Sequence, residues 1–438
     1  MSAKPINVGL LGIGTVGGGT FTVLRRNAEE ISRRAGRPIC ITVVADRDLE
    51  LAKKVTGGTC RLTDDAHAVV ADAGVDIVVE LIGGCGVAKD LVLSAIENGK
   101  HVVTANKALL AIHGNEIFAA AQRKGVMVAF EAAVAGGIPI IKAVREGLTA
   151  NRIQCIAGII NGTTNFILSE MRDKGLSFDA VLKEAQRLGY AEADPTFDIE
   201  GVDAAHKITI LSALAFGIPM QFDKAHIEGI SKLDATDIRY AEQLGYRIKL
   251  LGITKRTETG IELRVHPTLI PAKRLIANVE GAMNAVLVQG DAVGSTLYYG
   301  KGAGAEPTAS AVIADLVDVT RMHTADPEHR VPHLAFQPDQ LADLSIVPID
   351  DVVTSYYLRL RIQDKPGVLA EITRILADQK ISIDAMMQKE PSEGETQTDL
   401  VLLTHQTCEK YINAAIGRIE ALPVVAGKVT RLRLEMLG

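Results

Sequence analysis

Short apolar runs alternate with helical stretches over the first third of the chain. The runs span residues 6–11, 39–44, 75–81, 101–104 and 126–130, and residues 21–35, 90–98 and 115–124 between them space apolar and charged side chains as helices do. The runs are mostly apolar rather than strictly alternating, which is typical of strands buried on both faces. This pattern predicts a Rossmann-like, doubly wound parallel sheet in an α/β domain over residues 1–134.

Residues 135–322 mix helical and strand patterns. Ser177 can cap a helix running to residue 188, and a second helix over residues 201–216 would stop at Gly217 with Pro219 beyond it. In residues 261–265 apolar side chains alternate with Glu262 and Arg264, which predicts a half-buried strand. Residues 285–289 are a further strand candidate. We expect a separate α+β domain here.

The last part of the chain changes character twice. Residues 323–350 carry four prolines and little periodicity, which predicts a linker. Residues 351–438 follow the order strand, helix, strand, strand, helix, strand of a ferredoxin-like βαββαβ domain. In the first of these strands Leu358, Leu360 and Ile362 share one face while Arg359 and Arg361 share the other, so we expect its sheet to be covered on one side only.

The composition of the chain argues against several classes of function. The 438 residues include 47 basic and 53 acidic side chains, a net charge of −6 without any basic block, which argues against a nucleic-acid surface. The five cysteines are scattered with no C-x-x-C pair, so neither a disulfide framework nor a zinc site is indicated, and a reducing cytoplasm fits. Residues 5–24 carry no charge, but glycines interrupt them, and we expect no membrane role.

A glycine-rich turn directly follows the first predicted strand. In a G-x-G-x-x-G turn the first glycine permits the tight bend, the second lets backbone approach a pyrophosphate, and the third lets the next helix pack closely with its N-terminus toward the anion. Because a strand and a helix flank this turn, it predicts a dinucleotide site rather than a plain glycine turn. Its residues are Gly12, Ile13, Gly14, Thr15, Val16 and Gly17.

The end of the second predicted strand carries two residues with opposite implications. Asp46 is placed to bind the adenosine ribose, which favours NAD. Arg47 follows it and would favour the 2′-phosphate of NADP, unless it is a solvated loop residue. The cofactor preference stays open, leaning to NADP.

Later strands also end in small or polar residues, at the sheet edge where ligands bind in such folds. Thr104 ends the fourth run and Lys107 follows it, and Glu131 follows the fifth run. A lysine directly after a buried strand is well placed to contact substrate beside a nicotinamide. The alternative is an ordinary surface charge.

The densest group of polar residues lies between positions 189 and 207. Asp203 and Lys207 are four apart and share one face of a helix, where an exposed ion pair would stabilise by only about 0.3–0.5 kcal/mol. Glu192, Asp194 and Asp198 crowd the loop before that helix, beside an Asp-Pro turn signal. We therefore favour a reaction centre over a surface ion pair. Nearby, Asn161 opens a formal glycosylation sequon, which has no route to modification without a secretory signal.

Four stretches have the form of family motifs. They are residues 103–107, residues 158–165, the run Ala185, Gly189, Tyr190, Ala191, Asp194, Pro195, Asp198, Ile199, Gly201, Asp203 and Lys207, and the stretch from Gly302 and Gly304 to Val312. Together they resemble the homoserine dehydrogenase family, in the form without a preceding kinase-like segment. The resemblance covers about residues 8–319, and the final part, with residues 364–369, resembles an ACT domain, so nearly the whole chain is included.

The resemblance implies reversible, nicotinamide-dependent interconversion of L-homoserine and L-aspartate 4-semialdehyde, on the route to threonine, methionine and isoleucine. Such chemistry needs a base for the hydroxyl proton and a hydride acceptor. Lys207 would move the proton and Lys107 would be a second cation near substrate and nicotinamide, which leaves open which lysine acts. Thr104, Gly302 and Gly304 would join the cofactor site. Glu192 would hold the substrate ammonium group, and the other pocket residues would be Asp198, Asp203, Tyr190 and Thr163.

The resemblance further implies a monovalent cation, with sodium the expected ion. Its ligands would be the Glu131 carboxylate and the backbone carbonyls of Val134, Gly136 and Ile138, a hard-oxygen set without nitrogen or sulfur. The open alternative is that Glu131 is a structural carboxylate.

The ACT-like part implies an amino-acid sensor with threonine as the expected effector. Asp364 and Gly367 lie in the predicted loop between its first strand and helix, where backbone groups could receive a zwitterion. The alternative is a dimerisation domain that binds no ligand. The family resemblance implies a homodimer, and ACT pairing could raise it to a homotetramer.

Two other functions compete with this interpretation. One is a different ACT-tailed dehydrogenase, for example of a 2-hydroxy acid, but its glycine loop would lie in mid-chain with a catalytic histidine nearby. The other is a catalytically silent nucleotide and amino-acid sensor, in which Lys107 and Lys207 would be dispensable.

Overall fold

The computed structural model describes residues 4–391 and 394–437. Its N-terminal sheet has the order β3-β2-β1-β4-β5-β6 with parallel neighbours throughout. This confirms the doubly wound parallel sheet, and the unpredicted edge strand β3 has only three residues. The strands are β1 (Ile6–Leu11), β2 (Ile39–Ala45), β3 (Arg61–Thr63), β4 (Ile77–Glu80), β5 (His101–Thr104) and β6 (Val128–Ala129).

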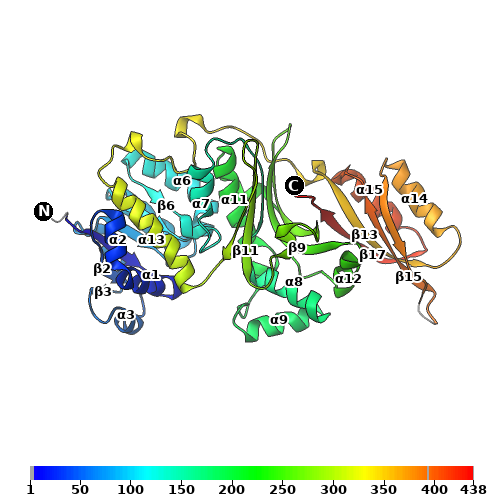
Figure 1. The fold of residues 1–438 in the computed structure, drawn as a ribbon, viewed down its shortest axis with the longest axis horizontal. Coiled ribbons are helices and arrows are strands. Elements are labelled where there is room, and N and C mark those ends of the chain that lie inside the picture. Colours follow the sequence, from blue (N-terminus) through cyan, green and yellow to red (C-terminus); the bar gives the residue numbers. More distant parts are fainter. Residues whose placement is uncertain (1–3, 392–393, 438) are drawn as a thin grey trace.

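Helices cover both faces of this sheet (Figure 1). The single helix predicted over residues 21–35 is wrong, because the chain forms α1 (Thr15–Arg26) and α2 (Ala28–Ala35) with a break at Asn27. Helix α13 (Ala305–Met322), which follows the middle sheet in the chain, returns to pack on α1, where a Cβ at Gly19 would lie 2.5 Å from the Ala305 carbonyl oxygen. The remaining helices are α3 (Leu49–Thr56), α4 (Ala66–Ala71), α5 (Gly86–Glu97) and α6 (Lys107–Lys124).

The middle of the chain builds a second, mostly antiparallel sheet. Its strands are β7 (Ile153–Ile159), β8 (His226–Ile227), β9 (Tyr246–Arg256), β10 (Ile261–Pro271), β11 (Met283–Gly290) and β12 (Gly294–Lys301). Its helices are α7 (Ile140–Lys142), α8 (Gly162–Lys174), α9 (Phe178–Arg187), α10 (Thr196–Ile199), α11 (Val202–Phe216) and α12 (Ala235–Gln243). The predicted helix ends at Ser177 and Gly217 are confirmed, although the Ser177 side chain makes no capping hydrogen bond.

Strand β10 is buried along its whole length, so the prediction of a half-buried strand over residues 261–265 is wrong. The alternating polar side chains are inside because they pair with one another. The Arg264 guanidinium donates to Glu262 at 2.7 Å and to Glu435 at 2.5 Å. A buried charge is tolerated when it is paired and hydrogen-bonded. Alternation of apolar and polar residues looks the same whether the polar side chains are exposed or buried in ion pairs.

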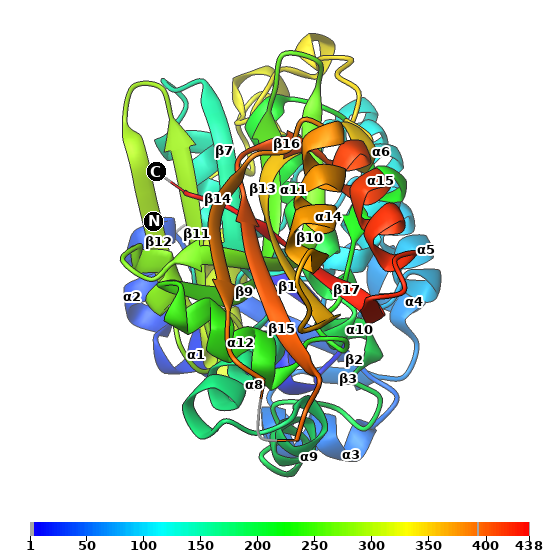
Figure 2. The ribbon, with the colours of Figure 1, turned by 90° about the vertical axis from the view of Figure 1, so that its right-hand side faces the viewer.

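The C-terminal domain has the predicted βαββαβ order. Its elements are β13 (Val353–Gln363), α14 (Val368–Asp378), β14 (Ile383–Gln388), β15 (Gln397–Thr404), the short β16 (Thr407–Cys408), α15 (Glu409–Glu420) and β17 (Val425–Leu434). Strand β17 pairs with β10, so the order β12-β11-β7-β9-β10-β17-β13-β15-β14 makes one sheet of two domains. Helices α14 and α15 lie on one side of the C-terminal part of this sheet (Figure 2).

The second face of the C-terminal sheet is also covered, contrary to the prediction of a one-sided sheet. Helix α12 of the middle domain packs there. Its buried Asp237 accepts hydrogen bonds from the Tyr357 hydroxyl at 3.0 Å and from the Arg359 guanidinium at 2.6 Å. A single strand's pattern could not reveal this layer, because another domain supplies it.

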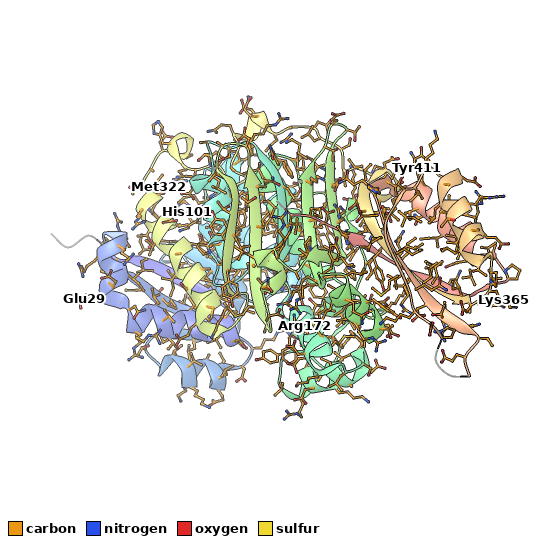
Figure 3. All side chains as sticks on the ribbon, turned by 45° about the vertical axis from the view of Figure 1, so that its right-hand side comes forward. Glu29, His101, Arg172, Met322, Lys365 and Tyr411 are labelled. Carbon is orange, nitrogen blue, oxygen red and sulfur yellow. The ribbon has the colours of Figure 1, made fainter. Side chains whose placement is uncertain are left out.

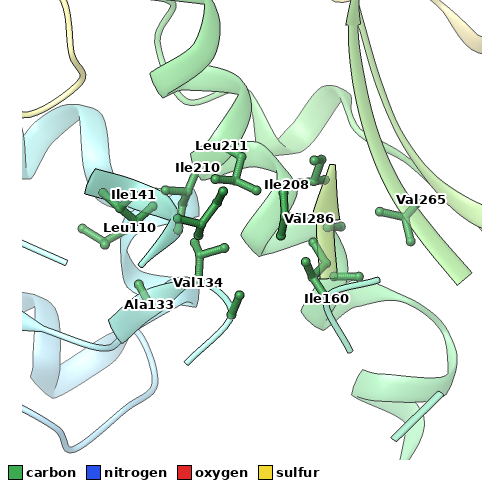
Figure 4. Close-up of a cluster of buried hydrophobic side chains, with 14 of the residues drawn as sticks. Leu110, Ala133, Val134, Ile141, Ile160, Ile208, Ile210, Leu211, Val265 and Val286 are labelled. Atoms are coloured by element: carbon green, nitrogen blue, oxygen red, sulfur yellow. The ribbon is translucent and has the colours of Figure 1, made fainter. Parts of the chain in front are cut away.

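Helix α11 joins the N-terminal domain to the middle sheet. Figure 4 shows its Ile208, Ile210 and Leu211 between side chains near Leu110 on one side and near Val286 on the other. A helix that is apolar on nearly all sides is a buried one, and its first turn therefore holds its polar residues in a fixed place. None of the helices in residues 4–391 and 394–437 is long and apolar enough to cross a membrane.

Candidate active site

The glycine turn after β1 has the geometry of an anion cradle. Gly12 has a positive φ of 94°, and a Cβ there would lie 2.8 Å from the Leu81 carbonyl oxygen. A Cβ at Gly17 would lie 2.0 Å from the Gly12 carbonyl oxygen, whereas one at Gly14 would meet nothing within 4 Å. Helix α1 starts at Thr15 without a side-chain cap, so its first N–H groups can bind an anion. Ile13 is buried in the turn, and Val16 continues the first helical turn.

A cavity of about 580 Å³ lies at the carboxyl ends of β1, β2 and β4, next to this turn. Asp46 lines it and accepts hydrogen bonds from Ile13 N at 2.6 Å and Asp48 N at 2.9 Å. The Asp46 carboxylate is thus tied to the glycine turn, while the neighbouring Arg47 is exposed. The other residues that line the cavity are Gly12, Gly14, Ala45, Asp64, Asp65, Ala66, His67, Leu81, Ile82, Gly83 and Val87.

Glu80, which the sequence reasoning missed, organises the next part of the sheet edge. It is fully buried at the end of β4 and accepts hydrogen bonds from Ile82 N and Gly83 N, both at 2.9 Å, and from the Thr104 hydroxyl at 2.7 Å. Thr104 in turn accepts from the backbone N–H of Asn106, the residue that caps α6. Lys107, the first residue of α6, is therefore held on a rigid support. The sequence feature that could have indicated this role is an acidic residue, Glu80, inside an otherwise apolar predicted strand.

Asp203 joins the two lysines that the sequence singled out. Lys207 Nζ lies 2.7 Å from Asp203 Oδ2, and Lys107 Nζ lies 3.1 Å from Asp203 Oδ1. The side chains of Asp203 and Lys207 are only 4% and 11% exposed, while that of Lys107 is 35% exposed. Lys207 also donates to the Ile160 carbonyl oxygen at 2.7 Å. The structure thus brings together residues 96 positions apart or more, from α6 and α11, at one buried carboxylate.

The charges in this cluster perturb one another. Burial lowers the pKa of Lys207, and Lys107 lowers it further, while Asp203 raises it. Burial alone would raise the pKa of Asp203, but Lys207 and Lys107 hold it well below its usual range. The cluster is therefore a carboxylate that stays ionised beside an amine that gives up its proton more readily than an exposed lysine does.

Asn161 links this cluster to a second carboxylate. Its Nδ2 donates to Asp203 at 2.8 Å and to Asp198 at 2.7 Å, while its Oδ1 caps α8. Thr163 donates to the Tyr190 carbonyl oxygen at 2.7 Å and to Asp198 at 3.3 Å. Burial and the Asp203 charge raise the pKa of Asp198. In the sequence Asn161 stood in a sequon and in one of the family-like motifs, and neither indicates that its side chain bridges two carboxylates.

Glu192 is not drawn into this cluster by any contact among the described residues. Its side chain is exposed, on the same loop as Tyr190, whose ring stacks on Phe166 with centroids 4.5 Å apart. Asp194, on that loop, accepts from Thr196 N at 3.1 Å and supports the turn into α10.

The segment from Gly302 to Gly304 lies against the loop that follows Glu131. A Cβ at Gly136 would lie 2.4 Å from the Gly302 carbonyl oxygen, and Gly304 has a positive φ of 123° where α13 begins. Since α13 packs on α1, this segment faces the helix of the glycine turn.

Glu131 is buried, and its carboxylate accepts Ile141 N and Lys142 N, both at 2.9 Å. Each oxygen keeps a further lone pair. Ile138 O already accepts from Ile140 N at 2.7 Å. In the described residues no group of three or more His, Cys, Asp or Glu side chains could hold a metal ion. One carboxylate with backbone carbonyls, including those of Val134 and Gly136, fits a hard monovalent cation better than a transition metal.

Comparisons with known proteins agree with this geometry. Residues 12–131 match the family model "Homoserine dehydrogenase, NAD binding domain", residues 139–317 match "Homoserine dehydrogenase", and residues 356–424 match "ACT domain". The homoserine dehydrogenase of Pseudomonas aeruginosa is 64% identical over 435 residues, covering 99% of this chain and 100% of that one. The one from Neisseria gonorrhoeae is 62% identical, covering 99% of each.

Solved structures give the same result. The crystal structure of a homoserine dehydrogenase from Thiobacillus denitrificans has 73% identity and a TM-score of 0.96, with all of both chains covered. A hyperthermophilic archaeal homoserine dehydrogenase in complex with NADPH has 26% identity and a TM-score of 0.62, covering 72% of this chain and 98% of that one.

Proposed function

This chain belongs to the homoserine dehydrogenase family, and from that premise we propose how its residues interconvert L-homoserine and L-aspartate 4-semialdehyde. It is an NAD(P)-dependent oxidoreductase that acts on a CH–OH group. The observation that carries the proposal is the convergence of Lys207 and Lys107 on the buried carboxylate of Asp203.

Lys207 is the group we propose to move the proton. In homoserine oxidation its neutral amine takes the hydroxyl proton, and in the reverse direction its ammonium returns a proton to the carbonyl oxygen. When bound, the nicotinamide cofactor would accept the hydride in oxidation and donate it in reduction. Burial and the neighbouring Lys107 lower the pKa of Lys207, which suits a group that must exist in both forms near neutral pH. Asp203 and the Ile160 carbonyl hold its Nζ in place.

Lys107 is the more exposed of the two lysines, and among the described residues its ammonium group contacts, besides Asp203, only the Phe197 ring, 6.0 Å from the ring centroid. We assign it to the substrate oxygen, as a fixed cation that stabilises charge developing there. Its place at the start of α6, directly after β5, supports this assignment.

The substrate's amino-acid end is assigned to the second part of the site. Asp198, held by Asn161 and Thr163, offers a carboxylate next to the lysine cluster, and Tyr190 borders it. Glu192, exposed on the same loop, is free to bind the ammonium group. Asp203, in the first turn of α11, completes the lining of this pocket.

The cofactor site follows from the glycine turn. Residues 12–17 bind the pyrophosphate, and Thr104, Lys107, Gly302 and Gly304 complete the nicotinamide side. We propose NADP as the preferred cofactor. In support, Arg47 is exposed and borders the cavity, where its guanidinium can meet a 2′-phosphate.

We also assign the loop after Glu131 to a monovalent cation, with sodium the expected ion. Glu131 would supply carboxylate oxygen, and Val134, Gly136 and Ile138 carbonyl oxygen. Detection of no ion by flame photometry in dialysed protein with Glu131 intact would count against this site.

The ACT domain is proposed to sense threonine and to inhibit the enzyme by feedback. Gly367 begins α14 in a left-handed conformation, and Asp364 lies just before it, so backbone groups of this loop can receive a zwitterion. The enzyme would work in the cytoplasm as a homodimer or homotetramer, on the route to threonine, methionine and isoleucine.

The test is the absorbance of reduced nicotinamide, followed with L-homoserine and NAD or NADP, each with and without threonine. Lys207→Ala should lose most turnover while nucleotide affinity survives. Lys183→Ala, which changes an exposed lysine of α9, is the matched control and should keep turnover. Unchanged turnover of Lys207→Ala would refute the assignment of the proton to Lys207, and no rate with either nucleotide would favour a silent sensor.

A further inference from the structure

The ACT domain lies far from the catalytic cluster, so any influence on the site must be carried through the fold. In Figure 3 Lys365, next to Asp364, lies at the outer end of the molecule, with the C-terminal sheet between it and the middle domain. The two domains meet where β17 pairs with β10. Strand β8 and residues 228–230 occupy this junction, since β8 pairs with β10 and Glu228 N donates to Val265 O at 2.8 Å.

On one side of the junction the Glu228 carboxylate is clamped by β17. It accepts two hydrogen bonds from the Arg433 guanidinium, both at 2.9 Å, and one from Arg431 at 3.0 Å. Arg433 is 1% exposed and also binds Glu409 of α15. Bidentate, charge-assisted hydrogen bonds of this kind are directional and strong. His226 Nε2 of β8 also lies 2.8 Å from Glu228 Oε1, so the ACT domain and the middle domain together set the position of the Glu228 carboxylate.

On the other side the same segment supports the catalytic helix α10 by direct backbone contact. Ile230 N donates to the Ile199 carbonyl oxygen at 2.8 Å. A Cβ at Gly229 would lie 2.4 Å from that oxygen and 2.5 Å from the Glu200 Cα. No flexible side chain separates the two segments there, so a movement of one displaces the other.

Helix α10 carries Asp198, and Asn161 connects Asp198 to Asp203. An unbroken series of contacts thus leads from Arg433 of the ACT domain through Glu228 and α10 to the carboxylate that holds both lysines. Packed contacts of this kind are a physical route for coupling between two sites.

We propose that Glu228 is a positioning residue for the substrate side of the active site, and that its clamp to β17 is the route by which the ACT domain acts on catalysis. The first part needs no effector. The second part rests on the proposed threonine response.

The test compares Glu228→Gln with Asp237→Asn. Both variants remove one carboxylate that joins the middle domain to an ACT arginine, but Asp237 lies on α12, which packs on α8 and β9 rather than against α10. Steady-state kinetics would give KM for L-homoserine, KM for the nucleotide and kcat, and melting temperatures would report folding. We expect KM for L-homoserine to rise about fivefold or more in Glu228→Gln, the lower range of coupling between protein sites. The nucleotide KM should stay unchanged, and Asp237→Asn should change neither KM.

Gly229→Ala is a second variant that keeps every ion pair and pushes α10 directly. It should raise KM for L-homoserine in the same direction as Glu228→Gln. This covers the case in which Glu228→Gln folds poorly. Equal effects of Glu228→Gln and Asp237→Asn, or a normal KM in folded Gly229→Ala, would overturn the positioning role.

Threonine inhibition separates the two proposals. If wild type is inhibited, Glu228→Gln should need at least about fivefold more threonine for half inhibition, while Asp237→Asn should respond as wild type does. Unaltered inhibition in Glu228→Gln would refute the route. A wild type that threonine does not inhibit would refute the sensor role and the route together, and the KM comparison would still decide the positioning role.

Discussion

Substituting Asp203 by Asn is the sharpest test of the lysine cluster. The substitution keeps the shape of the side chain and its place in α11 but removes the charge that Lys207 and Lys107 share, at 2.7 and 3.1 Å. Two ammonium groups would then face each other beside a neutral amide. The change affects both stability and proton transfer, and the two effects can be measured separately.

The size of the stability effect follows from burial. Removing one partner of a buried ion pair costs about 3–5 kcal/mol. Lys107 is 35% exposed and can turn toward solvent. Because water screens its interaction with Asp203, losing that interaction should cost at most about 1 kcal/mol of stability. We therefore expect the free energy of unfolding to fall by about 2–4 kcal/mol, mostly through Lys207, which burial prevents from relaxing. Urea unfolding at constant pH measures this loss.

The effect on the reaction is a displaced pH profile. Asp203 raises the pKa of Lys207, so its neutralisation should lower that pKa further. Homoserine oxidation needs the neutral amine, and its rate rises with pH through the pKa of the base, so the rising limb of kcat should move to lower pH. Carbonyl reduction needs the ammonium form, so its falling limb should move to lower pH as well. Since positioned acid–base catalysis contributes about 10²–10⁴-fold, the maximal kcat should drop about 100-fold or more.

Asp194→Asn is the control, because Asp194 lies on the preceding loop and is exposed. It should leave both limbs in place. If Asp203→Asn shows the limbs of wild type, then Lys207 is not the group that titrates in the rate, and the assigned proton transfer is refuted even if kcat falls.

Three further predictions use other parts of the structure. Arg47→Ala should raise KM for NADP about tenfold or more, because the proposed charge-assisted hydrogen bond to the 2′-phosphate is lost. KM for NAD, which has no such phosphate, should stay unchanged. Equal changes for both nucleotides would contradict the assigned 2′-phosphate contact. Burial and Glu131 raise the pKa of Asp315 to about 8, so ionisation should make wild type less stable as pH rises from about 4 to about 8. The free energy of unfolding of Asp315→Asn should exceed that of wild type by on the order of 2–4 kcal/mol at pH 7 and equal it at pH 3.5, as urea unfolding at the two pH values would show. Burial lowers the pKa of His333 to about 4, and the neutral ring accepts a hydrogen bond from Val128 N at its Nε2, at 3.0 Å. Wild type should therefore lose stability as pH falls from about 6.5 toward about 4, because the unfolded chain binds this proton first. His333→Phe should show a flatter pH dependence of its melting temperature.

Local patterns in the sequence predicted much of the fold. The five predicted strands of the N-terminal sheet and the βαββαβ order of the ACT domain agree with the structure, although β3, α3 and α4 were not predicted. One error is local, the break at Asn27 between α1 and α2, and two others concern layers that other parts of the chain supply. Strand β10 looked half-buried because its neighbours β8 and β17 and the Glu435 partner of Arg264 come from elsewhere in the chain. The ACT sheet looked one-sided because α12 belongs to another domain.

The candidate site divides in the same way. The glycine turn after a strand and the Asp203–Lys207 spacing are properties of one or two adjacent elements, where the repeat of the helix or strand determines which side chains meet. The sequence by itself therefore determined these. Only the tertiary structure decided that Lys107 reaches Asp203, that Asn161 bridges two carboxylates, and that Glu228 joins the ACT domain to α10. These contacts, like the burial that shifts the pKa values, depend on how elements far apart in the sequence pack together. The local repeat of a helix or strand carries no information on that packing.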